Sequence, residues 1–199
     1  MKSLFSSKAI QGVAFFFMLW SCTPSWAAPD AVAGKAKAQV CAACHGDSGV
    51  SSVPGFPHLA AQPPLSIFYQ LLQFRDQRRK GGGMEAMAAT LSEQDMRDIA
   101  AYYAGLPAPA PVAGGSVEKI AHGQNIAQQQ YCSSCHGAQL QGQKHVPRLA
   151  GQASDYFVTQ LRNLRSGARA DMDGTMASAA RSLTDEEIEA MAVYARSLP

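Results

Sequence analysis

The sequence Cys41-Ala42-Ala43-Cys44-His45 determines how the rest of the chain is interpreted, and it recurs once as Cys132-Ser133-Ser134-Cys135-His136. Two cysteines three residues apart lie on one face of a helical turn, from which their sulfurs can reach both vinyl groups of one porphyrin. The histidine that follows presents a ring nitrogen to the iron, and the whole pattern is a c-type haem attachment site. The sequence therefore predicts two covalently bound haem c groups, with Cys41, Cys44, Cys132 and Cys135 as thioether residues and His45 and His136 as iron ligands.

Two other chemistries use paired cysteines. A zinc cage built from two Cys-x-x-Cys pairs usually has about 15–20 residues between the pairs, whereas these pairs lie in separate halves of the chain. A thioredoxin-type dithiol requires a βαβ setting and has no histidine at this place. Because each motif is followed by glycine in an exported chain, haem attachment is the favoured interpretation.

Residues 1–27 are predicted to be a secretory signal peptide, which places the protein in the periplasm. Lys2 and Lys8 precede a short apolar run from Ala9 to Trp20, and Ser25 and Ala27 fit a cleavage site after Ala27. The apolar run is too short for a confident membrane span, which disfavours an uncleaved anchor. A lipoprotein signal that ends at a lipidated Cys22 is the other alternative.

Cysteine usage and charge narrow the function further. Of the five cysteines, Cys22 leaves with the signal peptide and the other four are assigned to haem. The mature chain has equal numbers of basic and acidic side chains, so nothing favours a nucleic-acid partner. Two basic clusters are expected to be solvated helix ends, with a docking patch for an acidic redox partner as the alternative. They comprise Arg75, Arg78, Arg79 and Lys80, and Arg162, Arg165 and Arg169.

The chain is an internal duplication. Matched residues lie 90 to 92 positions apart along the whole mature sequence. The matches include Cys41 with Cys132, Pro57 with Pro147, Leu59 with Leu149, Gln62 with Gln152, Gln70 with Gln160, Arg75 with Arg165, Met84 with Met176 and Tyr102 with Tyr194. We expect a first copy over residues 28–106, a Pro- and Gly-rich linker over 107–115 that is stiff and then flexible, and a second copy over 116–199.

Each copy is expected to be all-α and wrapped around one haem. A copy of about 80 residues is small for a hydrophobic core of its own, so the haem should form part of that core. Helices are expected over 31–44 and 116–135, over 65–79 with a twin that is N-capped by Ser154, and after capping-box sequences at Ser92 and Thr184. No stretch shows the sustained alternation of a strand.

The repeat also identifies the second iron ligand. Met84 and Met176 are the methionines that align between the copies, each in an expected loop seven residues before a leucine. Met87 and Met172 align with other residue types, whereas Met96 and Met191 fall within helices and are interpreted as core residues. His58, His122 and His145 have no aligned histidine and are interpreted as surface or loop residues.

A His/Met ligand pair predicts an electron carrier. A thioether is a soft, neutral ligand, and Met/His ligation raises the haem potential. An iron with six ligands has no open position for oxygen or peroxide. The sequence therefore predicts an electron-transfer protein, not an enzyme.

These features together resemble the dihaem cytochrome c4 family. They are the two haem motifs, the Pro-x-Leu-Ala-x-Gln stretches that end at Gln62 and Gln152, the aligned methionines and a final helix that ends with Tyr and Leu. The resemblance implies two tandem class I cytochrome c domains related by a pseudo-twofold axis. It also implies that the carbonyls of Pro57 and Pro147 orient the haem histidines.

The resemblance further implies a periplasmic protein with peripheral membrane association. Such a protein would take electrons from a donor such as a quinol-oxidising complex and pass them to a terminal oxidase. Two alternatives stay open. One is the electron-accepting subunit of an enzyme complex such as a sulfide-oxidising flavocytochrome c. The other is a dihaem peroxidase, which needs an open or displaceable iron ligand.

Overall fold

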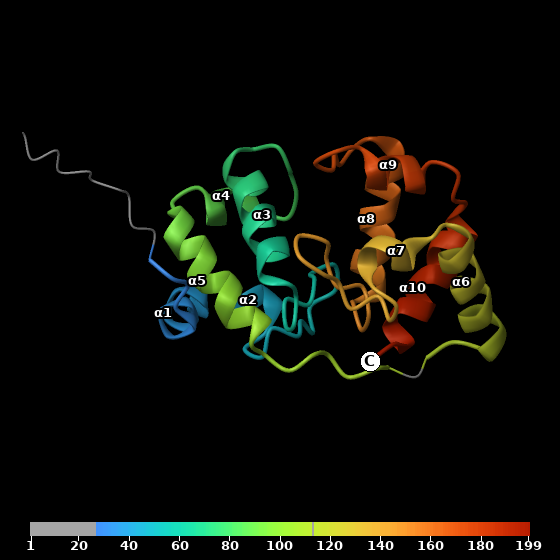
Figure 1. Cartoon of the computed structure of the whole chain (residues 1–199), viewed down its shortest axis with the longest axis horizontal. Helices are drawn as coiled ribbons and strands as arrows, with labels where there is room; N and C mark the ends of the chain where they lie inside the picture. Colours follow the sequence, from blue (N-terminus) through green and yellow to red (C-terminus); the bar gives the residue numbers. More distant parts are fainter. Residues whose placement is uncertain (1–26, 113) are drawn as a thin grey trace, which may run out of the picture.

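The computed structural model describes residues 27–112 and 114–199. The expected signal peptide, apart from Ala27, lies outside the described residues. Figure 1 shows two helical bodies side by side, with an extended segment running beneath them from one to the other. The expected all-α class is confirmed: within the described ranges the extended pairing is limited to one isolated bridge between Gln143 and Val146.

The helices follow the same order in both copies. In the first copy they are α1 (Ala31–Lys37), the 3-10 helix η1 (Ala38–Cys41), α2 (Ala42–His45), α3 (Pro64–Arg75), α4 (Met84–Ala88) and α5 (Glu93–Ala104). In the second copy they are α6 (Val117–Gln129), α7 (Cys132–His136), α8 (Ser154–Ser166), α9 (Thr175–Ala180) and α10 (Asp185–Ser197). The duplication inferred from sequence is thus a duplication of structure.

Four helix boundaries differ from the expectation. The first helix of each copy is interrupted before the haem motif, by the 3-10 turn η1 in one copy and by Tyr131 in the left-handed conformation (φ 53°) in the other. Helix α3 ends at Arg75, because Gln77 also adopts a positive φ of 55°. Ser154 is the first helical residue and not the N-cap, which is Ala153. The capping boxes at Ser92 and Thr184 are both present.

The first and last helices of each copy cross at a glycine. An added Cβ at Gly34 would lie 1.9 Å from the carbonyl oxygen of Asp98 in α5, and one at Gly123 would lie 2.1 Å from that of Ala190 in α10. A side chain cannot occupy that space without moving the backbone of the partner helix. These glycines therefore set how closely α1 approaches α5 and α6 approaches α10.

An ion pair reinforces this crossing in the first copy. Lys37 Nζ lies 2.6 Å from Asp95 Oδ1 and 2.7 Å from Asp98 Oδ2. The carboxylate of buried Asp98 also accepts a hydrogen bond from the backbone N–H of Asp30 at 2.9 Å. In the second copy the residue that takes the place of Asp98 is Ala190. The two copies therefore use different chemistry to hold the same helix pair.

The linker between the copies makes contacts with the second copy. The backbone N–H of Val112 donates to the carbonyl of Arg196 at 3.1 Å, near the end of α10. Pro109 is buried, and its atoms lie where a Cβ on Gly151 would meet them. The described part of the linker thus packs on the second copy, with its proline-rich half held by contacts as well as by its own stiffness.

Two glutamines join the copies by reciprocal hydrogen bonds. The amide of Gln62 donates to the carbonyl of Arg148 and accepts from its N–H, both at 2.9 Å. The amide of Gln152 makes the same pair of bonds with His58, at 3.0 Å and 2.7 Å. Because Gln62 aligns with Gln152 and His58 with Arg148, the interface has approximate twofold symmetry at these contacts.

A cluster of polar side chains lies at the same interface and corrects one expectation. Arg79 is buried, and its guanidinium donates to the Tyr156 hydroxyl at 2.8 Å and to the Gln160 side chain at 3.0 Å. The guanidinium of Arg169 donates to the same Gln160 side chain at 2.9 Å and to that of Gln70 at 3.3 Å. Burial, together with the nearby charge of Arg79, lowers the pKa of Arg169 to about 10. Arg79 and Arg169 are therefore interface residues and not solvated helix ends.

Substitution of Gly123 by alanine should destabilise the second copy. Its Cβ would clash with the backbone of α10, and overpacking of this kind typically costs about 1–3 kcal/mol. Gly114→Ala is the control, because nothing lies within 4 Å of the added atom there. Denaturant unfolding of the two holoproteins measures the effect. Equal stability of both variants would show that the crossing tolerates a side chain.

Acid should remove the contribution of the Lys37 ion pair. Lys37 lowers the pKa of Asp95 to about 2. Burial acts to raise the pKa of Asp98, but Lys37 and the Asp30 N–H outweigh it and hold that pKa below its usual value. A lowered carboxyl pKa stabilises the fold above the unfolded value of about 3.9 and ceases to do so as the pH falls through the folded value.

Asp98→Asn should therefore reduce the free energy of unfolding at pH 7, and the gap to the wild type should close as the pH falls from about 4 towards 2. Denaturant unfolding at a series of pH values measures that gap. A gap that stays constant over this range would mean that the charge of Asp98 contributes nothing.

Candidate functional site

The two motif histidines occupy equivalent, buried positions. His45 ends α2 and His136 ends α7, each with 4% of its surface exposed. The Nδ1 atom of His45 lies 2.9 Å from the carbonyl of Pro57, and that of His136 lies 2.8 Å from the carbonyl of Pro147. A carbonyl oxygen can only accept, so each Nδ1 carries the hydrogen. The proline contacts implied by the family resemblance are present in both copies.

This bond leaves the other ring nitrogen available. Burial lowers the pKa of both histidines, although the bond to the proline carbonyl favours the charged form. A neutral imidazole protonated on Nδ1 has a lone pair on Nε2, which is the form that binds a metal. Nε2 of His45 is buried and has no hydrogen-bond partner among the described residues. Such an atom fits coordination to an iron.

The four motif cysteines are in no disulfide, so all four are available to a haem. Cys41 and Cys132 are half-buried and pack against the core of their own copy. Burial raises the pKa of both thiols. Over residues 27–112 and 114–199, no group of three or more His, Cys, Asp or Glu side chains could hold a metal ion. The described part of the chain therefore offers no zinc cage.

The aligned methionines lie at the start of short helices, not in loops as expected. Met84 is the first residue of α4 and Met176 the second of α9. Each helix follows a glycine in the left-handed conformation, Gly83 or Gly174. Both methionines are half-buried and border the core cluster that the first haem cysteine of the same copy also borders. Cysteine, histidine and methionine of each motif thus belong to one copy.

The other methionines are placed as the repeat suggested. Met87 is 43% exposed and Met172 is 63% exposed, so neither side chain turns inward as the aligned methionines do. Met96 and Met191 are buried in the two cores. The contrast supports the choice of Met84 and Met176 over their neighbours.

The two methionine segments are held differently. The carboxylate of Asp171 accepts hydrogen bonds from the backbone N–H groups of Met176, at 2.7 Å, and Ala177, at 3.3 Å. In the first copy the carboxylate of Glu85 accepts from the N–H of Gly81 at 2.9 Å. Asp171 thus fixes the Met176 backbone directly, whereas Glu85 closes the turn ahead of Met84.

None of the remaining histidines is buried as the two motif histidines are. His122 and His145 are exposed. His58 is half-buried, and its Nδ1 accepts a hydrogen bond from the N–H of Ser51 at 3.0 Å. Burial, with the charge of Arg196, lowers the pKa of His58, so its ring is neutral at pH 7.

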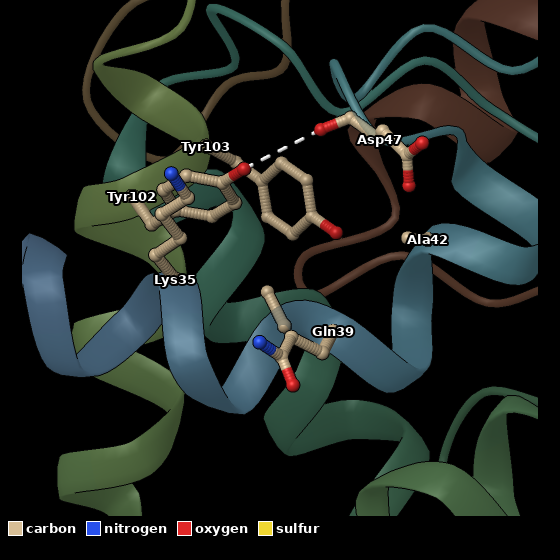
Figure 2. A pocket seen from close by; sticks show the side chains of 7 residues that line it. Lys35, Gln39, Ala42, Asp47, Tyr102 and Tyr103 are labelled. Carbon is tan, nitrogen blue, oxygen red and sulfur yellow. Dashed lines mark hydrogen bonds between the residues drawn. The ribbon is translucent and has the colours of Figure 1, made fainter.

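A small pocket of about 130 Å³ lies beside the first haem motif, between its helix and the end of α5. Figure 2 shows Tyr102 and Tyr103 projecting from α5 towards this motif, with the Tyr102 hydroxyl donating to the Asp47 carbonyl at 3.4 Å. Its lining includes Gln39 and Ala42 but neither motif histidine nor either aligned methionine. The pocket is thus on the outer side of the motif.

Family models match both copies separately. A model described as cytochrome c matches residues 120–199, and one described as cytochrome c oxidase, cbb3-type, subunit III matches residues 28–102. Cytochrome c4 from Pseudomonas aeruginosa is 38% identical over 183 residues, covering 86% of this chain and 90% of the relative. Cytochrome c4 from Thiocapsa roseopersicina is 42% identical, covering 85% and 93%.

The chain belongs to the cytochrome c4 family. The crystal structure of reduced recombinant cytochrome c4 from Pseudomonas stutzeri superposes with a TM-score of 0.80 and 32% identity, covering 86% of this chain and 100% of that one. A protein named thiosulfate dehydrogenase electron acceptor, from Thiomonas intermedia, is 30% identical, covering 92% of this chain and 87% of the relative. The predicted family is confirmed.

Membership of the cytochrome c4 family also confirms the class of protein. The chain is an electron-transfer protein with two cytochrome c domains and two haem c groups, each with a histidine and a methionine as axial ligands. The free, neutral Nε2 of His45 and the paired cysteines fit this cofactor.

The interface residues of this cytochrome c4 fold were not predicted from the sequence. Gln62 and Gln152 were aligned but given no role, and Arg79 and Arg169 were placed in solvent. The sequence does contain an indication of this contact, because Arg79 and Arg169 are also 90 positions apart, as other matched residues of the repeat are. Polar residues that recur in both copies and lie outside the haem motif are candidates for the contact between the copies.

Proposed function

We propose that this cytochrome c4 carries electrons in a periplasmic respiratory chain, with each copy holding one haem c. Cys41 and Cys44 form the thioethers of the first haem, and Cys132 and Cys135 those of the second. His45 and Met84 ligate the first iron, and His136 and Met176 the second. The observation that carries this proposal is the pair of equivalent Nδ1 bonds to proline carbonyls, which leave each Nε2 free to coordinate.

The chain's own residues suit electron transfer. When bound, each haem supplies a one-electron iron couple. The proline carbonyls keep each histidine in one tautomer and one orientation. The ring therefore neither rotates nor loses its Nδ1 hydrogen when the charge of the haem site changes. The methionine segment is held in place by Gly83 in one copy and by Gly174 and Asp171 in the other. Fixed ligands keep the structural change on oxidation small.

The location and boundaries form part of the same proposal. Residues 1–27 direct export and are removed after Ala27, the domains span 28–106 and 116–199, and residues 107–115 link them. In the part of the chain that the structure describes, no helix is both long and apolar enough to cross a membrane. The proposal includes peripheral contact with the membrane, through partner proteins such as a quinol-oxidising donor and a terminal oxidase.

A second candidate is the electron-accepting partner of a dehydrogenase. The sequence leaves this possibility open for a subunit of a sulfide-oxidising flavocytochrome c. The similarity to the Thiomonas intermedia protein, over 92% of this chain, instead favours thiosulfate dehydrogenase as the donor. This candidate shares the haem sites and differs only in the partner.

Purification from native membranes and periplasm separates these two roles. A free carrier should purify as a single chain and, once reduced, should be reoxidised by membranes that contain a terminal oxidase. An accepting subunit should instead copurify with its dehydrogenase and be reduced when thiosulfate is added. Failure of the oxidase membranes to reoxidise the protein would contradict the respiratory proposal.

Met176→Ala tests the ligand assignment. The haem should stay attached, because the cysteines and His136 are untouched. About half of the methionine-to-iron charge-transfer absorbance should disappear, and the potential of the second haem should fall while the first is unchanged. Visible spectroscopy and a redox titration measure these effects.

Met172→Ala is the matched control, because this exposed side chain lies four residues away and should leave both ligands in place. If Met172→Ala removes the band and Met176→Ala does not, the alignment of the copies is wrong, and Met84 loses its support as well.

A further inference from the structure

Arg148 is a buried cation without a counter-ion in the described protein. Its side chain and backbone together are 8% exposed. The guanidinium Nε and Nη2 atoms are buried and have no hydrogen-bond partner among the described residues. Burial lowers the pKa of Arg148, and no carboxylate acts against this effect. A buried charge of this kind is strongly destabilising unless an anion pairs with it.

The backbone around Arg148 fixes its place beside the second haem site. The preceding residue, Pro147, accepts the hydrogen bond from Nδ1 of His136 at 2.8 Å. The N–H and carbonyl of Arg148 itself are bound by the side-chain amide of Gln62 from the first copy, both at 2.9 Å. The backbone at Arg148 is thus fixed on both sides. Its side chain leaves the chain one residue after the carbonyl that orients the haem ligand.

The equivalent position in the first copy carries no charge. There His58 follows Pro57, and its backbone is bound in the same way by Gln152. Its Nδ1 already accepts the N–H of Ser51, and burial with the charge of Arg196 lowers its pKa. The duplication therefore places a permanent cation beside one haem site and a neutral imidazole beside the other.

We propose that Arg148 binds a propionate carboxylate of the second-copy haem and raises the reduction potential of that haem above the value it would otherwise have. A haem carries carboxylates at one edge, and guanidinium N–H groups bind carboxylates strongly in buried surroundings. A cation beside the site favours the reduced form, because reduction adds negative charge. This inference rests on the proposed haem site at His136.

Arg148→Gln in the holoprotein removes the charge and keeps a hydrogen-bond donor. The two potentials are measured by a redox titration followed by NMR, with the haem methyl signals assigned to each copy through contacts with its own residues. The potential of the second haem should fall and that of the first should stay unchanged. Arg148→Lys should keep most of the wild-type value, because it keeps the charge. Arg162→Gln is the matched control on the surface of the same copy and should change neither potential.

Arg148→His provides a second neutral variant if the glutamine does not fold, since the first copy accepts His58 at this position. It should also lower the second potential. An unchanged second potential, a shift in the first haem alone, or an equal fall in the lysine variant would each overturn the proposal. Two attached haems and an intact methionine band in these variants show that the haem sites themselves hold. A wild-type protein without two attached haems or without the methionine band would instead refute the proposed function.

Discussion

The hydrogen bond from each haem-motif histidine to a proline carbonyl is the contact on which the rest of the structure depends. It joins the end of the motif helix to a loop that begins about a dozen residues later, and it leaves Nε2 of the ring as a free donor of electron density. The same loops continue into Gln62 and Gln152, which bind the opposite copy. One contact thus links the metal ligand, the loop around it and the interface between the copies.

The duplication explains both the symmetry of the molecule and its departures from symmetry. Three features occur once in each copy: the helix crossing at a glycine, the proline carbonyl that binds the histidine, and the glutamine that binds the opposite copy. All three are needed to build one haem site and to join it to the other copy. The copies differ at other positions. The Lys37–Asp98 ion pair of the first copy is replaced by an apolar contact in the second. Glu85 accepts one backbone hydrogen bond, whereas Asp171 accepts two, and Arg148 takes the place of His58. The replacement of His58 by Arg148 changes the charge beside one site only, and unequal charges are a means to give two similar haems different potentials.

The sequence predicted the parts of the fold that are governed by local chemistry. The haem motifs, the capping boxes at Ser92 and Thr184 and the alignment of Met84 with Met176 all follow from residue type and spacing. The breaks before Cys132 and after Arg75 were missed, because they depend on Tyr131 and Gln77 in the left-handed conformation, which their residue types do not favour. The burial of Arg79 and Arg169 was also missed, since a cation on a helix end is ordinarily solvated and only the packing of one copy against the other covers these two.

The central claim is that each copy holds an iron between the Nε2 of its motif histidine and the sulfur of its aligned methionine. X-ray absorption at the iron edge of the holoprotein tests this claim most directly, with metal analysis to count the irons per chain. Two irons per chain are expected, each with a sulfur ligand beside nitrogen ligands, and the sulfur signal should fall by half in the Met176→Ala variant. Irons coordinated by nitrogen and oxygen alone, or a single iron per chain, would contradict it.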